Sequence, residues 1–163
     1  VVDSFPSDPA QFTYVIHRSK RASAGDDWTP LDTWSAKRAG QAIVISEGNT
    51  PYVKLQFPVR EGTEWNGNAF NSLGEDTYAL KAVRQPLALD GTTFENTVTI
   101  EQERNEDRIV FRDERTEVYA ENVGLVYRKI VQLDYCTADA CLGQQKVDDG
   151  VELTMTIIDY GRK

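Results

Sequence analysis

The sequence predicts an all-β fold: a single-domain antiparallel sheet that curves into a half-barrel or a barrel, with at most one short helix. Several short segments alternate apolar and polar residues, which is the period of a half-buried strand. Turn-forming dipeptides such as Asp90-Gly91 separate these segments, and no stretch of a dozen residues repeats apolar positions at helical spacing. Inward and outward alternation is the same in a closed barrel and an open half-barrel, so the sequence allows both.

One β domain over residues 1–163 is the organisation that length and composition favour. The chain has 163 residues, and about 70% of the unfolded surface of a chain this size can be buried on folding. Its 40% hydrophobic and 27% charged residues are typical of a globular protein. Neither an internal repeat nor a linker divides the sequence. Residues 1–10 contain Pro6 and Pro9 and are expected to form an extended lead-in.

The first half of the chain is expected to form four strands. Phe12, Tyr14 and Ile16 share one face of residues 12–18, which predicts a strand there. Residues 19–29 carry charges, a glycine and paired aspartates, so they are expected to form an exposed turn. The further strands are expected over residues 31–37, 41–46 and 52–57.

A long irregular segment follows these strands. Pro58 ends the strand before it, because proline cannot donate a hydrogen bond to the ladder. Residues 59–74 contain three glycines, Trp65 and Phe70 among several asparagines and serines. This segment is the part of the sequence that is most typical of a dedicated loop.

The second half of the chain begins with a predicted hairpin at Asp90-Gly91. The strand before the turn covers residues 77–83 and is expected to break at Pro86, while the strand after it covers residues 94–104. On the later strand the residues expected inward are Phe94, Asn96, Val98 and Ile100, and those expected outward are Glu95, Thr97, Thr99, Glu101 and Glu103.

Asn122 and Gly124 predict a second reversal, because both residue types tolerate positive φ. Residues 113–120 are compatible with a short helix, although Val118 and Tyr119 favour a strand. The strands expected around this turn cover residues 108–112, 115–120, 125–135 and 150–160. On the last of them one face is expected to carry Val151, Leu153, Met155 and Ile157.

The formal net charge of -8 argues against nucleic acid as a partner, because a phosphate backbone requires a clustered basic surface. An anionic membrane surface is disfavoured for the same reason. No apolar run approaches the roughly 18 residues that a spanning helix needs, so we expect no transmembrane segment. The chain begins at Val1 without a leader, which is typical of a mature or trimmed protein and allows a lipid anchor upstream of Val1.

The two cysteines, Cys136 and Cys141, are expected to form a disulfide that closes a small loop between strands. A zinc site would need two further ligands, yet the sequence has no other cysteine and a single histidine. A thioredoxin-like motif would have two intervening residues instead of four. The pair therefore favours an oxidising compartment, and the sequence indicates neither a metal nor a cofactor.

We assign no catalytic residue. His17 lies on an expected strand, and no Gly-x-Ser-x-Gly elbow supplies a nucleophile for it. Paired carboxylates can hydrolyse glycans when they face each other across a cleft, but neighbours on a strand point to opposite faces. A glycan hydrolase remains an alternative, and it would draw on Glu75, Asp76, Asp113 and Glu114.

Aromatic side chains beside asparagine and glycine are the most suggestive group for binding. Aromatic faces with adaptable amide groups can hold a sugar or an apolar ligand. The same aromatic residues can instead close the ends of a β core, which is the commoner role. The residues expected to contact a ligand are Tyr52, Trp65, Asn66, Asn68 and Phe70.

Two motifs resemble those of a known group of proteins. They are FPVREGTEWNGN at residues 57–68 and YAENVGLVY at residues 119–127. The chain from Tyr52 to Tyr160 resembles uncharacterised secreted or lipid-anchored β domains of Gram-negative bacteria, and its second motif is similar to one in periplasmic domains with a half-barrel sheet. The resemblance implies a curved sheet of the kind found in lipoprotein carriers, and it brings no catalytic residue with it.

Together these observations favour a non-catalytic, lipoprotein-type domain of the periplasm, outer membrane or cell surface. Such a domain would bind an apolar or amphipathic ligand, a glycan or a protein partner. The alternatives are the carboxylate-based glycan hydrolase and a structural or adhesive module, for which an exposed apolar patch or strand edge is expected.

Overall fold

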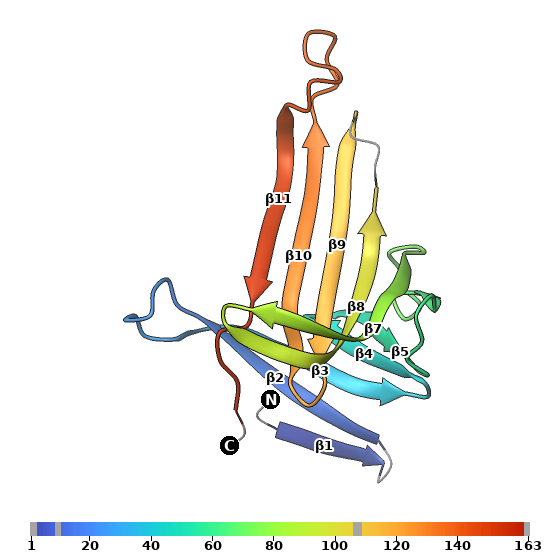
Figure 1. Cartoon of the computed structure of the whole chain (residues 1–163), viewed down its shortest axis with the longest axis vertical. Coiled ribbons are helices and arrows are strands. Elements are labelled where there is room, and N and C mark those ends of the chain that lie inside the picture. Colours follow the sequence, from blue (N-terminus) through green and yellow to red (C-terminus); the bar gives the residue numbers. More distant parts are fainter. Residues whose placement is uncertain (1–2, 9–10, 106–108, 162–163) are drawn as a thin grey trace. The chain divides into compact units, whose positions relative to one another are not determined.

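The structure is a computed structural model that describes residues 3–8, 11–105 and 109–161. Throughout these ranges the chain forms strands and turns without a helix, which confirms the predicted all-β antiparallel fold. The strands form two sheets instead of one, and in the described residues neither sheet closes into a barrel (Figure 1).

The chain divides into two compact units. The first comprises Val1–Val59 and Asn66–Glu75, and the second comprises Arg60–Trp65 and Asp76–Lys163. The single-domain expectation for residues 1–163 stays a prediction.

The first sheet has the strand order β1-β2-β3-β4-β5, so consecutive strands are neighbours. Its strands are β1 (Asp3–Asp8), β2 (Gln11–Lys20), β3 (Thr29–Ala39), β4 (Ala42–Glu47) and β5 (Thr50–Gln56). Part of the predicted lead-in is therefore a strand, because residues 3–8 pair with β2. Pro6 is tolerated in β1 because an outer strand has one edge without a ladder. The other lead-in residues lie outside the described ranges.

The second sheet has the order β11-β10-β9-β8-β7-β6. Its strands are β6 (Glu64–Asn66), β7 (Thr77–Leu89), β8 (Thr92–Arg104), β9 (Phe111–Ala120), β10 (Gly124–Tyr135) and β11 (Val147–Thr156). The helix option for residues 113–120 is wrong, since they pair with β8 on one side and β10 on the other. Residue 108 of the expected strand 108–112 lies outside the described part of the chain.

Both predicted reversals are confirmed. Asp90 and Gly91 have φ angles of 44° and 85° at the turn between β7 and β8. Asn122 and Gly124 have φ angles of 61° and 109° between β9 and β10. Left-handed backbone is accessible to these residue types, so the chain can reverse there with little strain.

Bulges in the β7–β8 hairpin overturn two expectations. β7 continues through Pro86 to Leu89, because the pairing shifts register on both sides of Gln85 and proline is tolerated at a bulge. Between Phe94 and Thr97, β8 has one residue more than the opposing segment of β7. The extra residue inverts the alternation, so Thr97 is buried, with its hydroxyl donating to the Gln85 carbonyl at 2.7 Å, while Asn96 is exposed.

A hydrophobic core in the second unit lies where the β7–β8 hairpin curls over the ends of β9 and β10 (Figure 1). The core consists of the buried residues Phe94, Val118, Ala120 and Val126, with Leu87, Leu89, Val123, Tyr127 and Ile157 packed against them. Curling the hairpin buries apolar area that a flat sheet would leave exposed, and apolar burial is the main stabilising term in folding.

The predicted disulfide between Cys136 and Cys141 is confirmed, with a Cα–Cα distance of 5.8 Å. It lies in the connection between β10 and β11, and both cysteines are buried. The Cys136 N–H also bonds the Lys146 carbonyl at 2.8 Å, which holds the two ends of the connection together.

Candidate functional site

Residues 59–74 were expected to be irregular, but Glu64–Asn66 form strand β6; asparagine side chains in and after β6 make hydrogen bonds that stabilise this segment. Asn66 Oδ1 accepts a hydrogen bond from the Asn68 N–H at 2.9 Å. Asn71 Nδ2 donates to the Pro51 carbonyl at 2.8 Å and to Asn68 Oδ1 at 3.0 Å. These amides pair with backbone and with one another, and Asn68 is buried. The contacts explain Asn66 and Asn68 as structural groups that shape the loop.

The aromatic residues expected to bind a ligand have different surroundings. Trp65 is half-buried and makes an edge contact with buried Tyr78, with ring centroids 6.1 Å apart. Tyr52 is half-buried beneath Lys54, whose Nζ lies 5.1 Å from the ring centroid. Phe70 is exposed. A ligand-binding role for Tyr52, Trp65, Asn66, Asn68 and Phe70 stays a prediction.

The carboxylates of the hydrolase alternative include two that share one arginine. Arg115 Nη1 lies 2.8 Å from Asp76 Oδ2, and its Nε lies 2.8 Å from Asp113 Oδ1. Burial alone would lower the pKa of Arg115, but the hydrogen bonds and negative charges of Asp76 and Asp113 raise it above its ordinary value. This cluster is a structural ion-pair network in the second unit.

Glu114 lies on the opposite face of β9 from Asp113. It accepts two hydrogen bonds from Arg112, at 2.9 and 2.7 Å, and lies 4.0 Å from Lys129 Nζ. The hydrogen bond with Glu114 raises the pKa of Arg112. Asp113 and Glu114 therefore do not face each other, as a glycosidase mechanism would need, and Glu75 is exposed.

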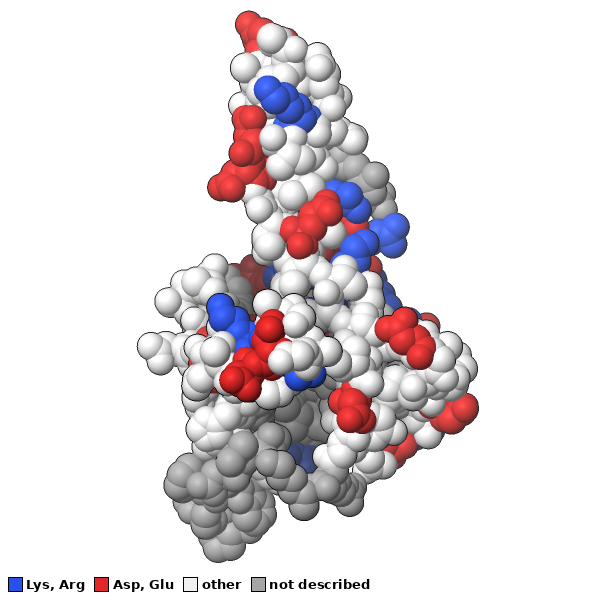
Figure 2. Space-filling view, turned by 90° about the vertical axis from the view of Figure 1, so that its left-hand side faces the viewer, with Lys and Arg blue, Asp and Glu red and all other residues white. Residues whose placement is uncertain are grey.

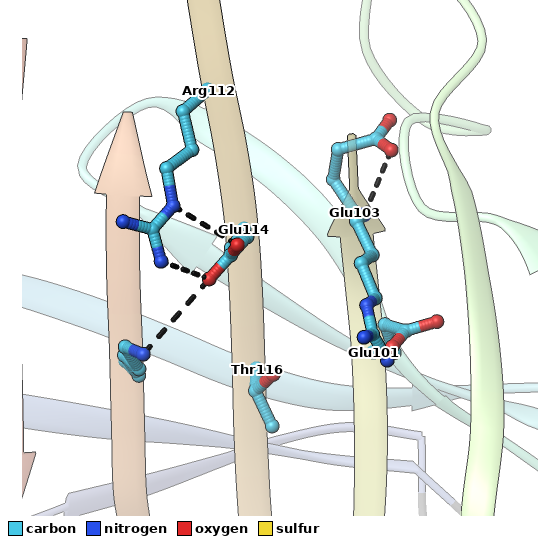
Figure 3. A pocket seen from close by; sticks show the side chains of 7 residues that line it. Glu101, Glu103, Arg112, Glu114 and Thr116 are labelled. Carbon is cyan, nitrogen blue, oxygen red and sulfur yellow. Dashed lines mark hydrogen bonds and ion pairs between the residues drawn. The ribbon is translucent and has the colours of Figure 1, made fainter. Parts of the chain in front are cut away.

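We call the face of β9 that carries Glu114 face A. A shallow pocket of about 300 Å³ lies there, and Figure 3 shows Arg112 and Glu114 pointing toward each other beside it. The pocket is lined by Glu101, Glu103, Arg104, Arg112, Glu114, Thr116 and Lys129. Glu101 is also paired with Lys81 at 2.9 Å. Positive and negative groups are thus largely matched on face A, which favours a structural role for them.

We call the opposite face of the sheet, which carries Asp113, face B. The register places residues of β9, β10 and β11 side by side there in four rows. The rows are Phe111–Asp134–Asp149, Asp113–Gln132–Val151, Arg115–Ile130–Leu153 and Glu117–Arg128–Met155.

The β9 and β10 positions of face B are mostly satisfied within the chain. Gln132 Nε2 donates to Asp113 Oδ2 at 3.2 Å. Arg128 Nε lies 3.3 Å from Glu117 Oε1, and Glu117 is 1% exposed. A buried carboxylate is tolerated when it is paired and hydrogen-bonded, so these groups hold the sheet together.

The β11 positions of face B are different, because they are apolar and exposed. Val151, Leu153 and Met155 are 49%, 40% and 39% exposed. The sequence predicted that these residues share a face with Ile157. The register confirms the shared face for Val151, Leu153 and Met155, but β11 ends at Thr156 and Ile157 packs against the hydrophobic core. Among the strands that the structure describes, β11 is the outer one of its sheet, and none of them pairs with its second edge.

The first row of face B holds two carboxylates in adjacent positions. Asp134 and Asp149 are directly opposite each other on β10 and β11, and both are exposed. They lie in an open pocket of about 480 Å³ that also contains Phe111 and Val151. Figure 2 looks onto the side of the sheet that ends in β11 and shows acidic side chains along it, with basic side chains among them. The sequence offered no signal for this pair, since it depends on the register.

Three further observations concern metal binding, His17 and membrane-spanning helices. Within the described ranges, no group of three or more His, Cys, Asp or Glu side chains is placed to hold a metal ion. His17 is exposed and lies 3.3 Å from the Thr33 hydroxyl, as expected for a histidine on a strand surface. The described residues also contain no helix with the length and hydrophobicity needed to cross a bilayer.

Comparison with known proteins gives no relative for this chain. No protein-family model, no curated protein and no solved structure matches it.

Proposed function

We propose that this protein is a non-catalytic binding domain that docks a protein partner along β11, the outer strand of the second sheet. The observation that carries the proposal is the combination on one strand of an open backbone edge and an exposed apolar row, a feature that is also expected of the adhesive alternative. An extended segment of a partner would add to β11 as a further antiparallel or parallel strand.

The hydrogen-bond pattern indicates which backbone groups of β11 face outward. The Ile157 N–H bonds the Val126 carbonyl at 2.9 Å, and the Tyr135 N–H bonds the Val110 carbonyl on the β9 side at 2.7 Å. Because hydrogen-bonded positions alternate along antiparallel strands, the amides of Glu152 and Thr154 point away from β10. Outward N–H and C=O groups are the template that a docking strand requires.

The exposed apolar row is the second feature of β11 that favours docking of a partner. Lysine, proline or a covering loop commonly protects an outer strand from adding another chain. β11 instead presents Val151, Leu153 and Met155 in a row beside its open edge. Covering these side chains would stabilise a complex through the hydrophobic effect.

A protein partner fits the surface better than the other ligand classes. Both pockets are open, and charged residues make up most of the lining on face A and four of the nine lining residues on face B, which suits a peptide more than a lipid. The disulfide supports placing the domain in an oxidising compartment such as the periplasm or the cell surface. Its lipoprotein character stays a prediction.

Selection of binders from a library of random linear peptides tests the proposal. Wild-type protein is the target, and Thr154→Pro is the blocked variant. Proline at position 154 removes an outward N–H while leaving the bonds to β10 in place. We expect peptides that bind the wild type and bind Thr154→Pro at least about tenfold more weakly. On binding, hydrogen exchange at the amides of Glu152 and Thr154 should slow.

Circular dichroism and thermal melting establish that Thr154→Pro is folded before its binding is compared. A second control changes the peptide: N-methyl groups along the edge that meets β11 should abolish binding, whereas N-methyl groups along its other edge should not. Peptides that bind Thr154→Pro as tightly as wild type, or a library that yields no binder, would contradict strand addition at β11.

A further inference from the structure

We infer that the docked segment is an extended basic peptide of a different protein, in which apolar residues alternate along one face and end in a lysine or arginine held between Asp134 and Asp149. This inference rests on the proposed function, because it names the chemistry of the strand that would lie beside β11. Three observations carry it: an uncompensated pair of carboxylates, the order of residues along β11, and the absence of basic residues from β11.

The carboxylate pair is a local conflict within the sheet. Asp134 and Asp149 occupy directly opposite positions, where like charges destabilise strand pairing. In the part of the chain that the structure describes, neither forms an ion pair with a lysine or arginine. The nearby carboxylate of Asp113, by contrast, is bound to Arg115. A cation from outside would relieve the repulsion between Asp134 and Asp149.

The surroundings of the pair suit a long basic side chain. A strand docked outside β11 lies one strand spacing from Asp149 and two from Asp134, about 5 and 10 Å, so only a long side chain such as lysine or arginine would reach both carboxylates. Glu152, on face A, lies close enough to Arg112 to contribute to raising its pKa, so it has a cation within the chain. The unmatched negative charge is therefore on face B.

The order of side chains along β11 gives the pattern of the partner. Side chains directly opposite each other on neighbouring strands are roughly 5 Å apart. On face B, β11 presents Asp149, then Val151, Leu153 and Met155 at every second position. A matching strand places a basic residue opposite Asp149 and apolar residues at the next alternate positions. The net charge of -8 favours the approach of such a basic segment.

A second copy of this chain is a poorer occupant than a basic partner. β11 would have to pair with β11 of the other copy, and Val147–Thr156 contains no lysine or arginine. In an antiparallel pairing centred on Leu153, the apolar rows would match, but Asp149 would lie opposite Ile157 and the carboxylate pair would remain uncompensated. Charge complementarity therefore favours a basic partner over a second copy of this chain.

The test uses peptides selected on the wild-type protein and then synthesised. We expect the selected sequences to carry a lysine or arginine at a fixed offset from alternating apolar residues. The double variant Asp134→Asn with Asp149→Asn should bind such a peptide about tenfold more weakly at low salt, and the difference should shrink at high salt. The control double variant Asp90→Asn with Glu121→Gln removes the same charge from two exposed turn positions and should bind as wild type does.

Two further probes make the result specific. A peptide of the same composition in scrambled order should lose binding, because alternation is destroyed. Replacing the basic residue of the selected peptide with glutamine should reduce its affinity for the wild type but hardly change its affinity for the Asp134→Asn, Asp149→Asn variant. The difference between these two changes in binding free energy measures the interaction between the basic residue and the carboxylate pair.

The outcomes separate the inference from the proposed function. If peptides bind and Thr154→Pro blocks them, but their affinity is the same for the carboxylate double variant, strand addition stands and the basic-partner inference is wrong. If the free protein forms a dimer that Thr154→Pro abolishes, the occupant is a second copy and the inference is equally wrong. If no peptide depends on the edge, the proposed function itself fails.

Discussion

The guanidinium of Arg115 binds the Asp76 carboxylate through two hydrogen bonds, from Nη1 to Oδ2 at 2.8 Å and from Nη2 to Oδ1 at 3.1 Å. The two residues are 39 positions apart in the sequence. Since Asp76 directly precedes β7 and Arg115 lies in β9, the pair fixes the start of β7 against the middle of the sheet. Such bidentate pairs combine geometric specificity with strength.

Replacing this arginine should destabilise the protein. Arg115→Met leaves Asp76 and Asp113 without their cation, and all three side chains are largely shielded from water. We expect the free energy of unfolding to fall by about 1 to 3 kcal/mol, measured by urea denaturation. Lys81→Met is the matched control, since the Lys81 side chain is 51% exposed in its pair with Glu101. An equal loss in both variants would contradict the structural role of Arg115.

The buried carboxylate of Glu117 should be more sensitive to substitution than the hydroxyl that binds it. Tyr119 donates to Glu117 Oε2 at 2.7 Å, and Arg128 lies beside Oε1. Tyr119→Phe removes one hydrogen bond to a charged group, worth about 1.5 to 3 kcal/mol. Glu117→Gln leaves a shielded arginine without its countercharge, so a loss of about 3 to 5 kcal/mol is expected. Urea denaturation measures the free energy of unfolding of both variants, and a larger loss for Tyr119→Phe than for Glu117→Gln would refute the prediction.

Asp149→Asn should stabilise the free protein. The substitution removes the like charge opposite Asp134 and keeps an oxygen that can accept the Gly150 N–H. The expected gain is about 0.2 to 1 kcal/mol at low salt, and it should decrease as salt screens the repulsion. Asp148→Asn is the control, since Asp148 has no partner in the β10–β11 register. Denaturation at two salt concentrations measures both, and a gain that persists at high salt would point to another cause.

Gly150→Ala should weaken the β10–β11 pairing. A Cβ at this position would collide with the Gln132 carbonyl oxygen and lie 2.7 Å from Leu133 Cα, and Gly150 has a φ of +137°. We expect a loss of about 2 to 4 kcal/mol and faster hydrogen exchange along β11. Gly25→Ala is the control, because a Cβ there meets open space. Unchanged stability of Gly150→Ala would contradict the steric and backbone constraint at this position.

The sequence predicted which β11 residues share a face, but it did not predict that this face is exposed. The alternation of Val151, Leu153 and Met155 predicted a shared face, and this was correct. Period-two alternation is the same whether that face packs inward or meets water, so exposure could not be predicted. In β8 a bulge inverted the alternation and buried Thr97, which no local pattern indicated.

By itself the sequence determined the all-β class, most strand positions, the turns at Asp90-Gly91 and Asn122–Gly124, and the disulfide. These features depend on local sterics and on contacts between residues close in the chain. Only the tertiary structure decided that the strands form two sheets, that Arg115 binds Asp76, and that Asp134 lies opposite Asp149. Those relationships depend on register and strand order, which arise when distant segments pair and cannot be derived from the period of a single strand.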